Sequence, residues 1–84
     1  MENKKKIVNQ ILYRSTHRGT KEMDILLGNF VKKYINTFNH KDLNDLNNII
    51  NCEDSILYNW YFNSIYHELI PDNKISKMLK SFKL

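Results

Sequence analysis

Hydrophobic residues recur along this chain at spacings that predict helices. The clearest series runs from Met23 to Phe38, where apolar residues alternate between steps of three and one over about five helical turns. An earlier apolar stripe, from Ile7 to Leu12, predicts a helix over about residues 4–15, and Gly19 separates the two. No stretch alternates apolar and polar residues over the length of a strand, and no segment repeats. The pattern therefore predicts an all-α fold.

Capping residues and shorter apolar series predict three more helices. Asn39, followed three positions later by Asp42, indicates the start of the third helix. We expect Asp54 or Ser55 to cap the fourth helix, and the Pro-Asp pair at 71–72 to open the fifth. The expected result is a small bundle of about five short helices that forms a single domain over residues 1–84. The buried positions expected in these last three helices are Leu43, Leu46, Ile49, Ile50, Ile56, Leu57, Trp60, Tyr61, Ile75, Met78, Leu79 and Phe82.

The composition agrees with a small folded protein. The 84 residues are 42% hydrophobic and 12% aromatic, and two glycines with one proline leave little material for tight turns. No apolar run reaches the ~18–20 residues that span a membrane, and the N-terminus lacks the apolar core of a signal peptide. Cys52 is the single cysteine, which excludes an internal disulfide and favours a reducing compartment. We expect a cytoplasmic protein with no membrane insertion.

Positive charge gathers near the two ends of the chain. The net charge is +4, with lysines at 4–6 and again at Lys74, Lys77, Lys80 and Lys83, whereas the segment from 42 to 54 is acidic. Such asymmetry suits either nucleic acid or an acidic patch on a protein. A small basic helical module that binds nucleic acid is therefore an alternative function. It would need a recognition helix or interleaved aromatic and basic residues, which the tail does not clearly show, so we expect its lysines to form a solvated face.

Spacings typical of catalytic, metal or nucleotide sites are absent from the sequence. His17, His40, His67 and Cys52 are isolated, with neither C-x-x-C nor H-E-x-x-H spacing. A nucleophilic pair of cysteine and histidine has no local support. Neither G-x-x-x-x-G-K-[ST] nor G-x-G-x-x-G occurs, so no familiar cradle for nucleotide phosphates is present. We expect neither an enzyme nor a metal protein.

Aromatic residues of the predicted fourth helix divide between two faces. Trp60 lies between Leu57 and Tyr61 on the apolar face, which favours core packing over a role as an interface anchor. Tyr58 and Phe62 lie off that face, and they are the better candidates for exposed contacts.

The segment STHRGTKEMDILLGNF, residues 15–30, carries an arginine that helix capping does not explain. Helix capping predicts two roles for Gly19: it ends the first helix with positive φ, and it is the N-cap of the second helix. Glu22 is then the third residue of that second helix. These roles leave Arg18 unexplained in a chain with eleven lysines and two arginines. The planar arginine fork binds carboxylates or carbonyls bidentately, which lysine cannot do. We infer that Arg18 faces a group that requires this geometry.

At this point the sequence resembles a known family. The segment ILYRSTHRGTKEMDILLGNFVKKYI is similar to the signature segment of the SdhE-type succinate dehydrogenase flavinylation factors, with an R-G-x-x-E motif that opens a helix continuing as D-x-L-L-x-x-F. A second block, IINCEDSILYNW, matches that family in order and separation, although Ser55 and Ile56 stand where many members read Pro-Asp. The C-terminal helix carries no specific match. The first block is made by Arg18, Gly19, Glu22, Asp24, Leu26, Leu27, Phe30 and Tyr34.

The resemblance implies an accessory protein that is not itself an enzyme. Members of this family bind the flavoprotein subunit of succinate dehydrogenase and promote covalent attachment of FAD to one of its histidines. Some bacterial members also serve fumarate reductase. FAD would be attached to the partner and not held by the factor, which we expect to be a monomer when free and to bind no nucleic acid. The flavoprotein-binding residues implied by the resemblance are Arg18, Gly19 and Glu22, with His17, Arg14 and Asp24 nearby.

Two substitutions follow from these expectations. If Arg18 forms a forked contact with the flavoprotein, Arg18→Lys should leave the melting temperature unchanged and weaken both binding and flavinylation. If Gly19 has positive φ, Gly19→Val should cost about 1–3 kcal/mol of stability.

Overall fold

Five α-helices and one short 3-10 helix make up the fold in the computed structural model, which describes residues 2–83. No strand occurs among those residues, so the predicted all-α class is confirmed. In chain order the elements are α1 (Glu2–Thr16), α2 (Lys21–Tyr34), the 3-10 helix η1 (Ile35–Thr37), α3 (His40–Ile50), α4 (Asp54–Phe62) and α5 (Lys74–Ser81).

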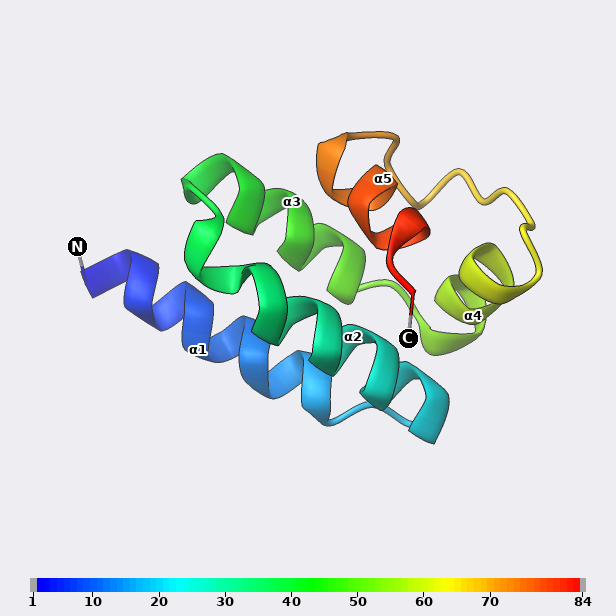
Figure 1. Ribbon diagram of the computed structural model, residues 1–84, viewed down its shortest axis with the longest axis horizontal. Coiled ribbons are helices and arrows are strands. Elements are labelled where there is room, and N and C mark those ends of the chain that lie inside the picture. The colour runs from blue at the N-terminus through cyan, green and yellow to red at the C-terminus, as the bar shows by residue number, and fades with distance from the viewer. Residues whose placement is uncertain (1, 84) are drawn as a thin grey trace.

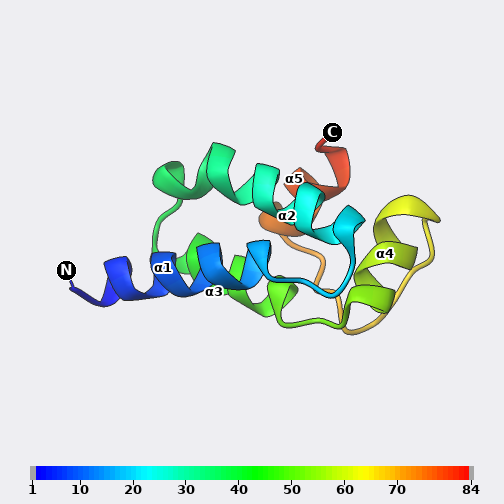
Figure 2. The same cartoon turned by 90° about the horizontal axis from the view of Figure 1, so that it is seen from below.

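The helices form an elongated bundle of 38 × 24 × 20 Å. α1 and α2 lie side by side and antiparallel, while α3 packs against α1 and also against α5 (Figures 1 and 2). α4 contacts α2 and lies at the end of the molecule where α1 passes into α2. The N-terminus is at the opposite end. This arrangement brings the connection between α1 and α2 close to the connection between α3 and α4.

The core is built mainly from α2 and α3, whose apolar stripes are buried as predicted. α1 adds Ile11, whereas its other predicted residues, such as Ile7 and Leu12, are half-buried against this core. In α4 only Leu57 is fully buried, and Trp60 packs against the core from a half-buried position. The buried apolar residues are Ile11, Met23, Leu26, Leu27, Phe30, Val31, Ile35, Phe38, Leu43, Leu46, Ile49, Ile50, Leu57, Ile70, Ile75 and Leu79.

Two of the five helix starts show the same reciprocal cap. Asn39 accepts a hydrogen bond from the Asp42 N–H at 2.8 Å, and the Asp42 carboxylate accepts from the Asn39 N–H at 3.4 Å, which confirms the predicted start of α3. α5 has the same box between Asn73 and Ser76, so the prediction that the Pro-Asp pair opens this helix is wrong. Asn73 satisfies an N–H group at the helix start, that of Ser76, and this group has no bond to Pro71 or Asp72, which lie two positions and one position earlier.

The predicted cap of α4 is also wrong. The N-cap residue is Glu53, which makes no side-chain cap bond, and Asp54 is the first helical residue. The Asp54 carboxylate does not cap its own helix because it binds groups of the connection between α1 and α2. This use of Asp54 is the centre of the candidate site.

Candidate functional site

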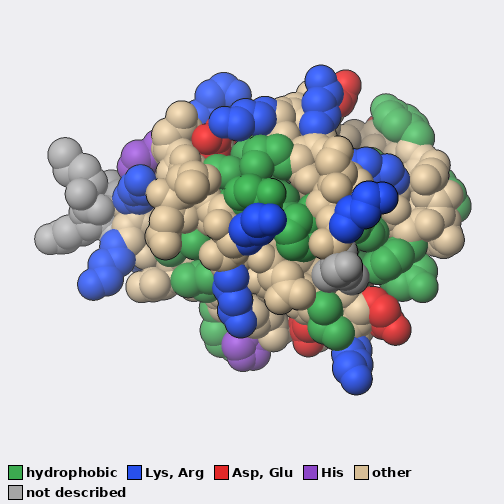
Figure 3. Space-filling view, viewed as in Figure 1, with side chains coloured by type: hydrophobic (Ala, Val, Ile, Leu, Met, Phe, Trp, Pro, Cys, Tyr) green, Lys and Arg blue, Asp and Glu red, His purple; other side chains and the backbone are tan. Residues whose placement is uncertain are grey.

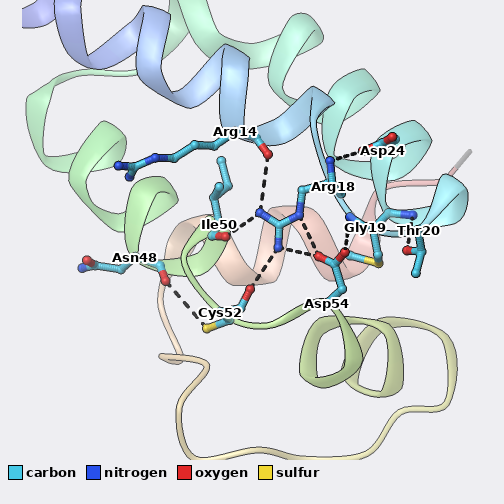
Figure 4. Close-up of polar contacts among 10 residues, drawn as sticks. Arg14, Arg18, Gly19, Thr20, Asp24, Asn48, Ile50, Cys52 and Asp54 are labelled. Atoms are coloured by element: carbon cyan, nitrogen blue, oxygen red, sulfur yellow. Dashed lines mark hydrogen bonds and ion pairs between the residues drawn. The ribbon is translucent and has the colours of Figure 1, made fainter.

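Three segments distant in sequence meet around the side chain of Arg18. The connection between α1 and α2 carries Arg18 and Gly19, the end of α3 supplies the Ile50 carbonyl, and the start of α4 supplies Asp54 (Figure 4). The Arg18 side chain is only 9% exposed, and that of Asp54 is 20% exposed. The arginine therefore lies inside the structure and not on a solvated face.

The Arg18 guanidinium bonds to groups on both sides of the connection between α3 and α4. Its Nε donates to Asp54 Oδ1 at 2.7 Å, and its Nη2 lies 2.6 Å from the same oxygen. Nη1 donates to the Ile50 carbonyl at 2.6 Å, and Nη2 donates to the Cys52 carbonyl at 2.9 Å. These contacts confirm that Arg18 faces groups requiring a planar fork, and all of them belong to its own chain.

Two partners of Arg18, the Ile50 carbonyl and the Asp54 carboxylate, lie at helix ends. Ile50 is the last residue of α3, where carbonyl groups lack an intrahelical donor and carry partial negative charge. Asp54 is the first residue of α4, where a carboxylate is favoured by the positive end of the helix dipole. The cation of Arg18 therefore lies beside a negative helix end and a carboxylate, which together offset the cost of its burial.

Two carboxylates also hold the backbone on which Arg18 and Gly19 lie. The Arg18 N–H donates to Asp24 Oδ1 at 2.5 Å, and the Gly19 N–H donates to Asp54 Oδ2 at 2.8 Å. Asp24 belongs to α2 and Asp54 to α4, so the connection is attached from two sides. Consecutive N–H groups of this connection are thus bonded within the chain.

The predicted conformation of Gly19 is wrong, because no glycine in the part of the chain that the structure describes has positive φ. A different constraint acts at this position: a Cβ atom on Gly19 would lie 3.4 Å from Asp54 Oδ2, at the near edge of ordinary contact. The predicted cap is wrong as well. Thr20 is the N-cap of α2 and accepts from the Met23 N–H, which places Glu22 at the second helical position instead of the third.

The other predicted site residues are more exposed. His17 stacks on Tyr13 with ring centroids 3.9 Å apart, and its Nδ1 lies 2.8 Å from the Tyr13 carbonyl. Arg14 donates to the side-chain oxygens of Asn47 and Asn51 on the α3 side. Glu22 and Gly19 are exposed. Of the six predicted residues, Arg18, Asp24 and Arg14 therefore use their side chains for bonds to other segments of the chain, whereas His17, Gly19 and Glu22 are exposed at the surface.

A shallow hollow of about 480 Å³ lies beside Arg18. It is lined by Tyr13 of α1, by His17 just after that helix, and by residues 50–54. No group of three or more potential metal ligands comes together among the residues that the structure describes. Within those residues, no helix is long and apolar enough to cross a membrane.

Cys52 lines the same hollow and is half-buried. Burial raises the pKa of its thiol above the ordinary value, and the nearby charge of Arg18 lowers it by a smaller amount. The thiol is therefore mostly protonated at neutral pH. Its Sγ lies 3.7 Å from the Asn48 carbonyl (Figure 4) and 3.7 Å from the Leu69 carbonyl, and either carbonyl can accept from the S–H group.

Sequence reasoning missed the roles of Asp54 and Tyr13. The local sequence predicts Asp54 only as a cap for its own helix, although an acid in the second family-like block is a natural partner for Arg18 in the first. Tyr13 lies four positions before His17, the spacing at which side chains on a helix meet, and this spacing could have indicated the stacked pair. The contact between Asp54 and Gly19 joins residues 35 positions apart and has no local signal.

Comparison with known proteins places this site in a family. Residues 9–83 match the family described as "flavinator of succinate dehydrogenase". Succinate dehydrogenase assembly factor 2, mitochondrial, from Arabidopsis thaliana is 37% identical over 59 residues, which cover 70% of this chain and 31% of that protein. The FAD assembly factor SdhE of Acetobacter pasteurianus is 35% identical over 71 residues, covering 84% of this chain and 62% of that protein.

A third relative, succinate dehydrogenase assembly factor 2, mitochondrial, from Scheffersomyces stipitis, is 35% identical over 72 residues that cover 84% of this chain and 48% of that protein. The chain thus spans between about a third and 62% of the length of these relatives. No solved structure shows a significant match to it. The family match covers the connection at Arg18, the Asp54 carboxylate and all of α2 to α5. On this match, the chain belongs to the family of flavinators of succinate dehydrogenase.

Proposed function

We propose that this chain is an assembly factor that binds the flavoprotein subunit of succinate dehydrogenase and promotes its covalent flavinylation with FAD. The observation that carries the proposal is the family match over residues 9–83, which includes every residue of the candidate site. The names of the relatives from Arabidopsis and Acetobacter agree with it. Fumarate reductase, which also carries a flavoprotein subunit, is a further proposed client.

The proposed binding surface surrounds the connection between α1 and α2. His17, Gly19 and Glu22 are exposed there, on a backbone that Asp24 and Asp54 hold from both sides. A surface held in this way loses little conformational freedom when a partner binds, which favours affinity. In this proposal Arg18, Asp24 and Arg14 shape the surface through internal bonds, and the exposed residues touch the flavoprotein.

The proposed action is a positioning effect and not catalysis by this chain. A protein that binds one conformation of its partner increases the population of that conformation. If that conformation aligns the flavin with the acceptor histidine, covalent attachment proceeds faster because less ordering remains to be done. The flavin stays on the partner in this proposal, since the chain has two glycines and no glycine-rich loop that would cradle a pyrophosphate.

The basic tail supports this proposal over binding of nucleic acid. Lys74 lies 3.4 Å from Asp42, and Lys80 lies over the Trp60 ring, 4.9 Å from its centroid. Two of the tail lysines thus have partners within the chain. We propose that the free chain is a monomer and works in the compartment where its flavoprotein is assembled. The predicted cytoplasmic location stays a prediction, since several relatives are named as mitochondrial.

The function is tested by producing the flavoprotein subunit with and without this chain and following covalent flavin by in-gel fluorescence over time. Glu22→Gln removes one exposed charge of the proposed surface, and Lys32→Gln, in the last turn of the same helix, is the matched control. Slower flavinylation with Glu22→Gln, and the parental rate with Lys32→Gln, is the expected result. A rate that is the same with and without the parent chain would refute the function. Tight binding to duplex DNA that falls steeply with salt would support the nucleic-acid alternative.

A further inference from the structure

A strip of exposed apolar side chains runs along α4 and the segment that follows it. Of the seven large hydrophobic residues that the structure describes as exposed, five lie between positions 58 and 69. Figure 3 shows hydrophobic side chains gathered at the end of the molecule where α4 and this segment lie. The residues of this strip, with their exposed fractions, are Tyr58 (38%), Phe62 (39%), Ile65 (53%), Tyr66 (82%) and Leu69 (62%).

The strip is part of a defined structure at both of its ends. α4 ends at Phe62, Ser64 follows with φ 56°, and the Ile65 N–H donates to the Asn59 carbonyl at 3.0 Å, which ties the chain after the helix back to its last turns. The Phe62 ring lies 4.7 Å from that of Tyr58. After Leu69 the chain turns inward at Ile70, which is buried. The exposed side chains are thus presented between two anchored points.

This strip adjoins the candidate site through a shared side of α4 and through one contact at its other end. Tyr58 and Phe62 follow Asp54 at spacings of four and eight residues, which places them along one side of α4 from the carboxylate that binds Arg18. At its other end, the Leu69 carbonyl lies 3.7 Å from the Cys52 thiol, and Cys52 lines the hollow beside Arg18. The strip and the site therefore form one surface.

We propose that this apolar strip is a second part of the surface that binds the flavoprotein subunit, and that it docks against an apolar patch of that protein. The inference rests on the proposed function, because the occupant is the same partner. Exposed aromatic and aliphatic groups gain free energy when a partner removes them from water, and aromatic residues are enriched among the anchors of protein interfaces. Five such groups beside a polar site match the usual arrangement of an apolar interface centre next to hydrogen-bonding groups.

The specific expectation concerns Tyr66 and Leu69, the two most exposed members. Each leaves most of its side chain in water in the free chain, so its burial by a partner would contribute to affinity without a competing loss of internal packing. Tyr66 adds a hydroxyl group that can bond at the edge of the contact. Flavoprotein binding should therefore depend on these two side chains, while folding should not.

The test uses the full chain with Ile65→Ser, Tyr66→Ser and Leu69→Ser combined, and a matched variant with Ile65→Val, Tyr66→Phe and Leu69→Met. Calorimetry with the purified flavoprotein subunit measures the affinity of each, and thermal melting checks that each is folded. We expect the serine variant to bind at least about tenfold more weakly than the parent. The matched variant, which keeps the apolar surface, should bind within about threefold of the parent.

Three other results would overturn the inference, and they can be told apart. If the parent and the serine variant bind equally well, the strip has no part in docking, but the proposed function stands. If the serine changes abolish dimer formation in sedimentation and leave flavoprotein affinity unchanged, the occupant is a second copy of this chain. If the parent itself does not bind the flavoprotein subunit, the proposed function fails and the inference fails with it.

Discussion

The Arg18 guanidinium lies between the carboxyl end of α3 and the amino end of α4 and bonds to groups from both. Its side chain is 9% exposed and its charge is matched by Asp54, while the carbonyls of Ile50, Cys52 and Arg14 accept from its remaining donors. A lysine ammonium in the same place is a compact charge that cannot reach these acceptors in one plane. The preference for arginine at this position therefore has a cause within the folded chain.

We expect Arg18→Lys to lower the free energy of unfolding by about 1–3 kcal/mol, because at least one buried carbonyl and part of the Asp54 contact would lose their donor. The sequence-based expectation of an unchanged melting temperature rested on a forked contact with the flavoprotein, whereas the contacts of Arg18 within the chain lead us to expect a loss of stability. Urea denaturation of parent and variant measures the change. Arg14→Lys is the matched control, since Arg14 is exposed, and its effect should stay within about 0.5 kcal/mol. Equal stability of Arg18→Lys and the parent would show that the fork is not needed for folding.

Cys52 gives a residue-scale prediction that depends on pH. Burial raises the pKa of its thiol in the folded chain, so folding favours the protonated form. The stabilisation from this protonated thiol is complete below the unfolded pKa of about 8.5 and is lost as pH rises through the higher folded value. The difference in unfolding free energy between the parent and Cys52→Ala should therefore be constant from about pH 6 to 8 and shrink above about pH 8.5. A difference that stays constant up to about pH 10 would contradict this assignment.

At the scale of elements, the sequence predicts the helices well and their ends less well. Apolar spacing identifies α2 and α3 because each buries a continuous stripe, and α1 because its stripe packs against them with Ile11 fully buried. The Asn39 cap of α3 works through residues three positions apart. Helix starts at α2, α4 and α5 are displaced from the predicted residues by tertiary contacts or by a better cap one or two positions away. Asp54 is the clearest case, because its long-range bonds to Arg18 and Gly19 are invisible in local sequence.

Gly28 is a test of how closely α1 and α2 pack. It lies inside α2, where glycine costs about 1 kcal/mol relative to alanine. A Cβ atom there would lie 3.5 Å from Thr16 Cγ2 of α1, which is ordinary van der Waals contact. We therefore expect Gly28→Ala to raise the unfolding free energy by up to about 1 kcal/mol, as measured by chemical denaturation.

Gly28→Val is the matched variant for the same position, because its two methyl groups demand space that a single Cβ does not. It should destabilise the chain by about 1–3 kcal/mol through overpacking against α1. A loss of stability with Gly28→Ala would contradict this expectation. It would mean that α1 and α2 pack too closely at Gly28 to admit a Cβ atom.

On the scale of the whole molecule, α4 is held to the rest by few contacts. It contributes one fully buried side chain, Leu57, whereas α2 contributes six buried residues. The other attachments of α4 include Asp54, which binds Arg18 and Gly19, Trp60, whose carbonyl accepts from Lys80, and Tyr61, whose hydroxyl donates to the Phe82 carbonyl. Helices with few buried contacts open at a lower free energy than the core. The α4 end, which carries the apolar strip, should therefore be the most easily opened part of the bundle.

Asp54→Asn tests this picture because it keeps the shape of the side chain and removes its charge. The buried Arg18 cation would lose its counter-charge, and an amide oxygen would accept more weakly from Arg18 and Gly19 than a carboxylate does. We expect the unfolding free energy to fall by about 1–3 kcal/mol, a large share of the roughly 4–12 kcal/mol available to a chain of this length. Asp45→Asn, which removes the partner of Lys41, a lysine whose side chain is 82% exposed, should change the unfolding free energy by less than about 0.5 kcal/mol.

Hydrogen exchange separates a local from a global effect of Asp54→Asn. If Asp54 mainly attaches α4 to the rest of the bundle, the amides of α4 should exchange much faster in the variant. The exchange rates of the α2 and α3 amides should change only as much as the change in global stability requires. Flavoprotein binding should then weaken even under conditions where the variant is fully folded by circular dichroism, because both the Gly19 surface and the apolar strip depend on the position of α4. Uniform acceleration of exchange in every helix would instead mean that α4 unfolds only with the whole molecule, and that Asp54 supports the fold as one cooperative unit.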